Sequence, residues 1–286
     1  MPIVKSSMQG KICMVTGANS GIGKATALAL AQMGATVVMV CRDRARGEEA
    51  RSEIITKSRN TAVDLLQADL SSQQSIRQLV ENFQHHYTHL HVLINNAGAA
   101  FPRRRETVDG VEMTLAVNYL APFLLTHVLL DVLKASAPAR VVNVSSGSHE
   151  AGYIKLDNLQ SKNPYGSMKV YGQAKLAVVL FTYELARRLE GTGVTVNCLH
   201  PGFVATHFGQ RDVGPAFRLL VKVIGSFGTS PAKGAKTSLY LASSPKVEGV
   251  TGNYFVKSIP KRSASISYDE SLQRQLWEQS AQLVNV

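Results

Sequence analysis

The chain has 286 residues, of which 45% are hydrophobic and 18% are charged, with 22 glycines and 10 prolines. This composition is typical of a globular protein and excludes intrinsically disordered, collagen-like and coiled-coil chains. The formal net charge is +11, but the lysines and arginines are scattered without a zinc-finger, RNP or heptad pattern, so we expect no nucleic-acid binding.

Short apolar runs recur at wide spacing along the chain, rich in valine and isoleucine and bounded by Gly, Asn or Asp. Runs of this kind, without strict alternation, are typical of strands that are buried on both faces, as in a parallel sheet. They span residues 12–16, 36–41, 63–68, 91–95, 141–145, 194–199 and 253–256.

Helical patterns lie between these runs, and several carry residues that start helices. Ser71-Ser72-Gln73-Gln74 is a capping box, and Ser230 puts a cap residue before Pro231 at the first helical position. The longest apolar helical pattern covers residues 176–185. After Ser271, apolar residues at helical spacing predict an amphipathic helix in the tail: Leu272, Leu276, Leu283 and Val284.

The alternation of strands and helices predicts right-handed crossovers and an α/β fold, a doubly wound sheet of about seven parallel strands with helices on both faces. No linker or internal repeat interrupts it, so residues 1–286 are interpreted as one domain. Residues 203–230 contain no strand candidate and are interpreted as an insertion above the sheet. The amphipathic tail covers about 260–286.

A glycine-rich turn follows the first strand directly and opens the helix predicted at residues 24–32. Gly17 permits the tight turn, Gly21 lets backbone approach a pyrophosphate, and Gly23 allows close packing of helix on strand. The phosphates then lie against the unpaired amides of the helix. This placement predicts a Rossmann-type dinucleotide site. Its candidate residues in the turn are Gly17, Asn19, Ser20, Gly21, Ile22 and Gly23.

The end of the second strand bears on which nicotinamide cofactor is bound. An NAD site usually has an acid there for the ribose 2′-hydroxyl, whereas the 2′-phosphate of NADP needs a cation. Here Cys41 is followed by Arg42 and Asp43. Asp43 could be the NAD-type acid, but its position fits the cap of the next helix better. Arg42 therefore favours NADP(H) over NAD(H), and Arg44 and Arg46 are interpreted as solvated helix residues.

The glycine spacing, Gly-x-x-x-Gly-x-Gly, resembles that of the short-chain dehydrogenase/reductase superfamily, and the resemblance covers nearly the whole chain. Asn118, Ser146, Tyr171 and Lys175 fall where the family keeps its catalytic residues. The resemblance implies further cofactor contacts beyond the glycine turn, from residues that follow the third, fourth and sixth strands and from the catalytic helix: Asp69, Leu70, Asn96, Ala97, Gly98, Tyr171, Lys175, Pro201, Gly202, Val204 and Thr206.

Hydride transfer to a carbonyl carbon leaves charge on its oxygen, so a site must supply a proton and a hydrogen bond there. A free tyrosine, with a pKa near ~10, is a poor acid–base catalyst at neutral pH, and a nearby cation lowers that pKa. Tyr171 and Lys175 are four residues apart, so on a helix they share a face. The resemblance implies that Lys175 also bonds the nicotinamide ribose, that Ser146 holds the substrate oxygen and that Asn118 orders a proton-relaying water.

Two neighbouring residues compete with these candidates. Tyr165 and Lys169 have the same spacing, but Pro164 beside Tyr165 predicts a loop, so we favour Tyr171. Ser145 and Ser146 point to opposite faces if the strand continues through them. The resemblance selects Ser146.

Four histidines crowd residues 85–91, and His85 and His89 have the spacing of a helical metal pair. A catalytic zinc normally requires three protein ligands in suitable geometry. We expect instead that this segment ends a helix, where imidazoles lie against carbonyl groups, and that the protein holds no metal.

The sparse cysteines, Cys13, Cys41 and Cys198, exclude a disulfide framework and favour a reducing, cytoplasmic location. Residues 1–10 contain no apolar run, and no stretch approaches the ~20 uninterrupted apolar residues of a spanning helix. We therefore expect neither a signal peptide nor a transmembrane segment.

Within the superfamily, residues 41–43, 137–146 and 191–194 are similar to the retinol dehydrogenase-like branch, as is the wide gap between Ser146 and Tyr171. The resemblance implies an NADP-preferring oxidoreductase of retinoids or other lipophilic alcohols, aldehydes, ketones or steroid-like compounds. The apolar segment 203–230 fits a lid over the substrate, a peripheral contact with lipid, or ordinary core packing.

The sequence thus predicts an NADP(H)-dependent enzyme that moves a hydride between the nicotinamide and an apolar alcohol or carbonyl compound. The alternative is a non-catalytic NADP-binding sensor or interaction protein on the same fold, because a fold does not fix a function. The resemblance also implies a homodimer through the helices that carry Asn118 and Tyr171, which the tail helix would reinforce or block.

Overall fold

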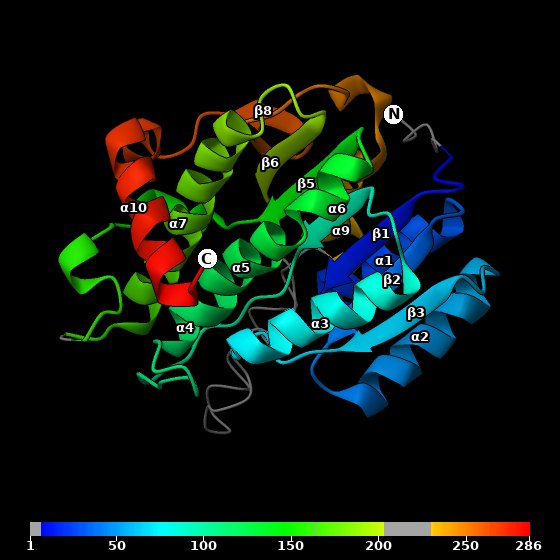
Figure 1. The fold of residues 1–286 in the computed structure, drawn as a ribbon, viewed down its shortest axis with the longest axis horizontal. Coiled ribbons are helices and arrows are strands. Elements are labelled where there is room, and N and C mark those ends of the chain that lie inside the picture. Colours follow the sequence, from blue (N-terminus) through cyan, green and yellow to red (C-terminus); the bar gives the residue numbers. More distant parts are fainter. Residues whose placement is uncertain (1–6, 163, 203–229) are drawn as a thin grey trace.

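The computed structural model describes residues 7–162, 164–202 and 230–286, and in it eight strands form one central sheet (Figure 1). Their order across the sheet is β3-β2-β1-β4-β5-β6-β7-β8. Neighbours from β3 to β7 pair in parallel, and β8 pairs antiparallel with β7. The strands are β1 Ile12–Thr16, β2 Thr36–Cys41, β3 Val63–Gln67, β4 Val92–Asn95, β5 Ala139–Val144, β6 Val194–His200, β7 Asn253–Val256 and β8 Ile259–Lys261.

The predicted fold class, a doubly wound parallel sheet, is confirmed, with one more strand than expected. Strands β1, β2 and β7 have the predicted bounds, and β5 begins two residues before the predicted start. The additional strand, β8, has three residues that are all exposed. Pro260 lies at its centre, which only an edge strand tolerates. This strand therefore gives no hydrophobic signal in the sequence.

Helices cover both faces of the sheet, as the alternation predicts (Figure 1). The apolar side chains of α1, α2 and α9 share one core cluster, and those of α3, α5, α6, α7 and α10 share the other. The helices are α1 Gly21–Gln32, α2 Arg44–Ser58, α3 Gln73–His86, α4 Met113–Leu115, α5 Ala121–Val128, α6 Leu130–Ala135, α7 Ser167–Arg188, α9 Pro231–Ser243 and α10 Glu270–Val284.

The two predicted helix starts are present, but the cap of α3 is Ser72, one residue later than a Ser71–Gln74 capping box requires. Ser72 precedes α3 and its side chain accepts a hydrogen bond from the Ser75 amide at 3.3 Å. Ser230 precedes α9 and accepts one from the Lys233 amide at 3.4 Å. These side chains satisfy amides that the first helical turn leaves unpaired. The buried residues of α3 are those that the helical spacing picks out: Ile76, Leu79, Val80 and Phe83.

The direction of the chain through the sheet reverses between β1 and β4, which lie side by side at its centre. The crossovers run from β1 toward β3 on one side and from β4 toward β7 on the other. In such sheets ligands bind beyond the carboxyl ends of the strands at this reversal. Strands β1, β4, β5 and β6 all end at that edge, and each of them is followed by predicted site residues.

The amphipathic helix predicted after Ser271 is confirmed as α10, Glu270–Val284, and the earlier part of the tail holds β8 and a short 3-10 turn. This helix, α10, packs along α7 (Figure 1). Its Trp277 ring lies 4.9 Å from the ring of Phe123, centroid to centroid, and the Arg188 guanidinium lies 4.3 Å from the Trp277 ring. The helix therefore covers an aromatic face formed by α5 and α7.

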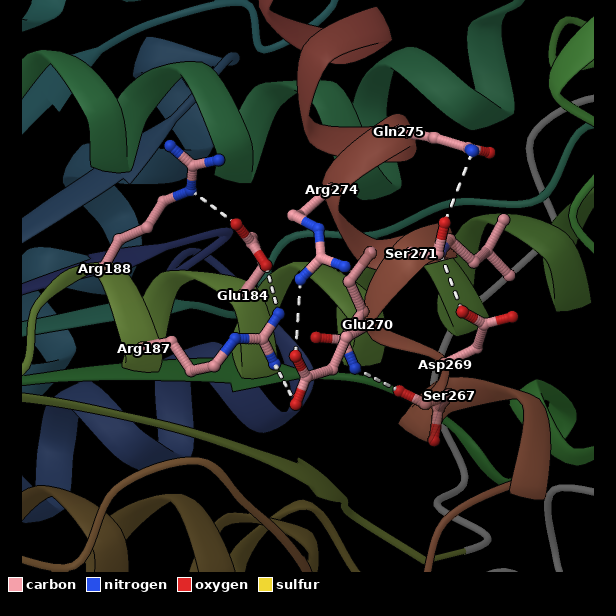
Figure 2. A network of polar contacts seen from close by, with 11 residues as sticks. Glu184, Arg187, Arg188, Ser267, Asp269, Glu270, Ser271, Arg274 and Gln275 are labelled. Carbon is pink, nitrogen blue, oxygen red and sulfur yellow. Dashed lines mark hydrogen bonds and ion pairs between the residues drawn. The ribbon is translucent and has the colours of Figure 1, made fainter.

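Charged residues form ion pairs at the polar edge of the contact between α7 and α10, as Figure 2 shows. The buried carboxylate of Glu184 on α7 accepts a hydrogen bond from Arg188 at 2.7 Å and pairs with Arg187. Arg187 also lies 3.9 Å from Glu270 of α10, which pairs with Arg274 at 3.3 Å. The network links the carboxyl-terminal part of α7 to the start of α10.

Candidate active site

The glycine turn between β1 and α1 has the backbone that its sequence requires. Gly17 and Gly21 adopt φ angles of 67° and 55°, in the left-handed region that favours glycine. A Cβ atom on Gly23 would lie 2.3 Å from the Gly17 carbonyl oxygen and 2.5 Å from Asn96 Nδ2. The role predicted for Gly23, close packing of the helix, is therefore visible in the structure.

The first turn of α1 is open to an anion. Ser20 occupies the capping position, but its side chain makes no capping hydrogen bond, in contrast to Asp43, Ser72 and Ser230 on other helices. The first turn of α1 also contains no acidic residue. Its amides and the positive end of the helix dipole thus fit the diphosphate of a dinucleotide.

The end of β4 is tied to the end of β1 by hydrogen bonds of Thr16. The Thr16 hydroxyl accepts hydrogen bonds from the Asn96 amide at 2.9 Å and the Ala97 amide at 3.0 Å. Asn96 Nδ2 donates to the Thr16 carbonyl at 2.8 Å. Asn96 and Ala97 were predicted as cofactor contacts, and the structure brings them against the glycine turn. Sequence analysis missed Thr16 because a threonine at a strand end is common.

The residues after β2 and β3 lie together at the same edge. Arg42 Nη1 lies 3.9 Å from the Asp69 carboxylate, and both side chains are substantially exposed. The Asp43 carboxylate accepts a hydrogen bond from the Arg46 amide and caps α2, so its interpretation as a helix cap is confirmed. Arg44 is exposed on that helix, as predicted.

Tyr171 and Lys175 lie one turn apart on α7 and are both buried. Lys175 Nζ donates to the Val144 carbonyl at the end of β5, at 3.0 Å, and lies 5.7 Å from the centroid of the Tyr171 ring. Tyr171 also has a side-chain hydrogen bond with Ser146. The structure thus brings three of the four predicted catalytic residues into one cluster.

Burial shifts the pKa values of this pair in opposite directions. It raises the pKa of Tyr171 to about 12, against the opposing effect of the hydrogen bond with Ser146. It lowers the pKa of Lys175 to about 8. The lowering of the Tyr171 pKa by Lys175 together with a bound nicotinamide stays a prediction.

Both choices between neighbouring candidates agree with the geometry. Ser145 is buried and its hydroxyl donates to the Lys175 carbonyl at 2.8 Å, while Ser146 lies beside Tyr171. Tyr165 lies in a loop before α7, and its hydroxyl donates to the Phe101 carbonyl at 2.9 Å. Tyr165 therefore does not share the helical face that Tyr171 shares with Lys175.

Asn118 lies in a π-helical turn, Ala116–Leu120, that joins α4 to α5. Its amide nitrogen donates to the carbonyls of Ala99 and Thr114 at 2.6 and 2.8 Å, and its oxygen accepts from the Ala99 amide at 3.2 Å. A Cβ on Gly98 would lie 2.8 Å from Asn118 Oδ1 and 3.4 Å from Lys175 Nζ. Asn118 therefore lies close to Lys175, and only a glycine fits between them.

Pro201 and Gly202 follow β6 at the same edge, and Gly202 has a φ angle of 86°. The predicted contacts Val204 and Thr206, and nearly all of the predicted insertion 203–230, lie outside the described residues. The segment of clustered histidines ends α3, as predicted: the His86 ring bonds the Asn82 carbonyl at 2.8 Å.

Two other histidines, His149 and His200, contact the backbone around Ser146. His149 Nδ1 lies 2.7 Å from the Ser146 carbonyl oxygen, and His200 Nδ1 accepts a hydrogen bond from the Gly147 amide at 3.0 Å. Sequence analysis assigned neither a role, because a lone histidine has no spacing that points to a backbone partner.

These features together define a dinucleotide-dependent oxidoreductase: a glycine turn at the reversal point of a parallel sheet, with a buried tyrosine–lysine pair at the same edge. The sequence profile of the family described as "short chain dehydrogenase" matches residues 11–213. The chain belongs to this family, whose members bind a nicotinamide cofactor.

Curated relatives place the chain in the retinol dehydrogenase-like branch of that family. It is 44% identical to human retinol dehydrogenase 14, with 98% of this chain and 88% of the relative covered. It is 42% identical to human retinol dehydrogenase 13, with 99% and 87% covered. The chain therefore matches these relatives across most of their length.

Solved structures agree with the fold. An uncharacterised protein from Mycobacterium Paratuberculosis has a TM-score of 0.80 and 31% identity, with 98% of this chain and 96% of that chain covered. The Pseudomonas aeruginosa RhlG/NADP active-site complex has a TM-score of 0.67 and 26% identity, with 88% and 96% covered.

Proposed function

We propose that this protein catalyses reversible hydride transfer between NADP(H) and an apolar alcohol or carbonyl compound. The main support for this proposal is that Tyr171, Ser146 and Lys175 lie close together, at the edge of the sheet where the glycine turn also lies. Membership of an oxidoreductase family supports it.

In the proposed reaction, Tyr171, Ser146 and Lys175 have separate roles around the substrate oxygen. When bound, the cofactor supplies or accepts the hydride at the carbonyl carbon. Tyr171 Oη donates the proton that the oxygen needs in reduction and takes it back in oxidation. Ser146 Oγ holds the same oxygen by a hydrogen bond, and Lys175 bonds a ribose hydroxyl.

The role of Asn118 as the residue that orders a proton-relaying water stays a prediction. Its amide nitrogen already bonds the Ala99 and Thr114 carbonyls, so a water could be bound only through its oxygen. What the geometry supports directly is that Asn118 fixes the backbone at Ala99, beside the active-site edge.

Arg42 supports NADP(H) rather than NAD(H). Its guanidinium is largely exposed at the edge beyond β2, and its one described ion pair, with Asp69, is long at 3.9 Å. The carboxylate that an NAD site would need, that of Asp43, is engaged in capping α2. The NADP complex of the RhlG neighbour is consistent with this preference.

We expect Arg42→Ala to weaken NADPH binding about 10- to 100-fold and to leave NADH binding nearly unchanged, because a charge-assisted hydrogen bond contributes about 1.5–3 kcal/mol. The measurement is a fluorescence titration of both cofactors. Arg44→Ala, at the next exposed arginine, is the matched control and should bind both like the wild type. A clear NADH preference that Arg42→Ala does not change would contradict the assignment.

The pKa of Lys175, about 8, predicts a pH dependence of cofactor affinity. Below about pH 8 the buried ammonium is charged and makes strong hydrogen bonds; as the pH rises through this value the amine becomes neutral and its bonds weaken. We expect the Kd of NADPH to rise about tenfold between pH 7 and pH 9.5. The profile of Lys175→Met should be flat, and an equal rise in that variant would contradict the assignment.

The substrate is proposed to be apolar, a retinoid or another lipophilic aldehyde, ketone or steroid-like compound, because the curated relatives are named retinol dehydrogenases. The test is to follow NADPH absorbance with the purified chain and a panel of aldehydes, ketones and quinones that includes retinal. Turnover of apolar members is the expected result. No turnover across the panel, with NADPH bound, would favour the non-catalytic sensor or interaction protein.

A homodimer through α5 and α7 is part of the proposal, with one constraint from the fold. Because α10 covers an aromatic face of these helices around Phe123, a second copy has to contact α10 or use another part of the pair. Sedimentation equilibrium would determine the oligomeric state.

Among the described residues no helix has the length and apolarity to cross a bilayer. A cytoplasmic location is proposed from the three buried, unpaired cysteines.

A further inference from the structure

Ser146 begins a short 3-10 turn, Gly147–Ala151, that follows β5. Its hydroxyl accepts a hydrogen bond from the Ser148 amide at 3.2 Å. The turn packs closely on α7 because glycines lie at the contact. A Cβ atom on Gly152 would lie 2.5 Å from the Gly172 carbonyl oxygen, and a Cβ atom on Gly172 would lie 2.9 Å from the Ser148 carbonyl oxygen. Since Gly172 adjoins Tyr171, this docking sets the distance between the serine and the tyrosine.

Two histidines hold the two polar atoms of one peptide group in this turn, the group that joins Ser146 to Gly147. The ring of His149, which is fully buried, bonds the Ser146 carbonyl through Nδ1 at 2.7 Å. The ring of His200, at the end of β6, accepts the Gly147 amide through Nδ1 at 3.0 Å. The peptide group directly after Ser146 is thus bonded at both its oxygen and its nitrogen, by one histidine from the turn itself and one from β6.

The backbone partners determine the tautomer of each ring. The Ala264 amide donates to His149 Nε2 at 3.2 Å, so that nitrogen carries no proton and Nδ1–H donates to the Ser146 carbonyl. His200 Nδ1 accepts from an amide, so its proton is on Nε2. Each ring is neutral in this arrangement, because protonation would remove an acceptor.

The surroundings of both rings favour the neutral form. Burial is the largest influence on the pKa of each and lowers it, although the hydrogen bond to Ser146 opposes the shift at His149 and the charge of Glu150 opposes it at both. The Tyr254 ring of β7 packs against His149 with centroids 4.7 Å apart. His149 is therefore held by packing on one side and by two backbone hydrogen bonds in its own plane.

We propose that His149 and His200 are positioning residues for Ser146, which hold its turn by one hydrogen bond to the Ser146 carbonyl and one to the Gly147 amide. Neither ring touches the reacting atoms. The inference rests on the proposed role of Ser146 and deepens it. A misplacement of about 1 Å can lower a rate about a hundredfold, so loss of either bond should affect kcat more than cofactor binding.

Substitution of His149 by asparagine or glutamine distinguishes a positioning role of this residue from a packing role. The amide of asparagine can replace Nδ1–H and donate to Ser146, whereas glutamine reaches the place of Nε2 and can accept only from Ala264. We expect His149→Gln to lower kcat about 10- to 100-fold and His149→Asn to lower it by less than about threefold, with the Kd of NADPH unchanged in both. A packing role predicts the reverse order, because glutamine is closer to histidine in volume.

The same logic applies at His200 with a different pair. His200→Asn offers an oxygen in place of Nδ1 as acceptor for the Gly147 amide and should keep most of the activity. His200→Leu removes the acceptor and should lower kcat about tenfold. His86→Asn and His86→Gln are matched controls, because the exposed His86 ring makes a similar bond to the Asn82 carbonyl; both should have wild-type kcat.

Amide hydrogen exchange in the same variants tests the inference without turnover. We expect the Gly147 and Ser148 amides to exchange at least about tenfold faster in His149→Gln and His200→Leu than in the wild type. If the wild type reduces no carbonyl but these rates rise, the proposed function fails and the anchoring of the turn stands. Equal exchange in all variants, or equal kcat in His149→Asn and His149→Gln, would overturn the inference.

Discussion

Replacing Tyr171 with phenylalanine is expected to lower kcat for carbonyl reduction about 10²- to 10⁴-fold. Phenylalanine keeps the buried ring but removes the only atom of this side chain that can exchange a proton with the substrate oxygen. The Kd of NADPH should change by less than about threefold, because the Lys175 amine and the glycine turn stay in place. Steady-state kinetics with the best panel substrate and a fluorescence titration measure the two quantities.

Tyr165→Phe is the matched control for this experiment, because Tyr165 belongs to the competing Tyr-x-x-x-Lys sequence. Its hydroxyl donates to the Phe101 carbonyl, so its removal should lower the free energy of unfolding by about 1 kcal/mol and leave kcat within about threefold. If Tyr171→Phe kept most of its turnover while Tyr165→Phe lost it, the catalytic tyrosine would be the other one. If neither variant lost turnover, acid–base catalysis by a phenol would be wrong.

The sheet could be predicted because most of its parallel strands, the edge strand β3 excepted, are buried on both faces and so have apolar sequences. Strand β2, with five of its six residues buried, has the predicted bounds. Strand β8 could not be predicted, because its exposed residues Ile259–Lys261 have no burial pattern and form the edge of the sheet, paired only with β7. The order of the strands across the sheet was not predicted and is seen only in the structure.

The π-helical turn around Asn118 was not predicted either, for a different reason. Its sequence, Ala116–Leu120, is apolar and helical in pattern, and the wider turn depends on bonds between the Asn118 side chain and the Ala99 backbone. Ala99 is distant in sequence and comes close only after β4 has joined the sheet. Such turns frequently occur at functional sites, but the pattern of residues 113–128 does not distinguish one from an ordinary helix.

In the site, Tyr171 and Lys175 could be predicted from their spacing on a helix together with Pro164, which places the competing Tyr165 in a loop. Spacing could not predict the roles of His149 and His200 beside Ser146, because these histidines bond backbone groups whose positions depend on the whole sheet. The burial that raises the pKa of Tyr171 was not predicted for a related reason. The sequence shows a neighbouring lysine, whereas the extent of burial follows only from the packing of α7.

Gly23→Ala should be the most damaging small substitution in the cofactor site. The added methyl group would lie 2.3 Å from the Gly17 carbonyl oxygen and 2.5 Å from Asn96 Nδ2. The first of these atoms belongs to the backbone of the glycine turn, so the turn or α1 has to move. We expect a loss of about 1–3 kcal/mol in the free energy of unfolding, because overpacking of a tight site has this cost.

The same displacement moves the α1 amides that the diphosphate would contact, and each hydrogen bond to a charged group contributes about 1.5–3 kcal/mol. The Kd of NADPH should therefore rise at least about tenfold, measured well below the Tm of the variant. Gly166→Ala is the matched control, because its Cβ would lie 3.5 Å from the flexible Lys169 side chain. It should bind NADPH like the wild type; a Gly23→Ala variant that did the same would show that the cofactor binds elsewhere.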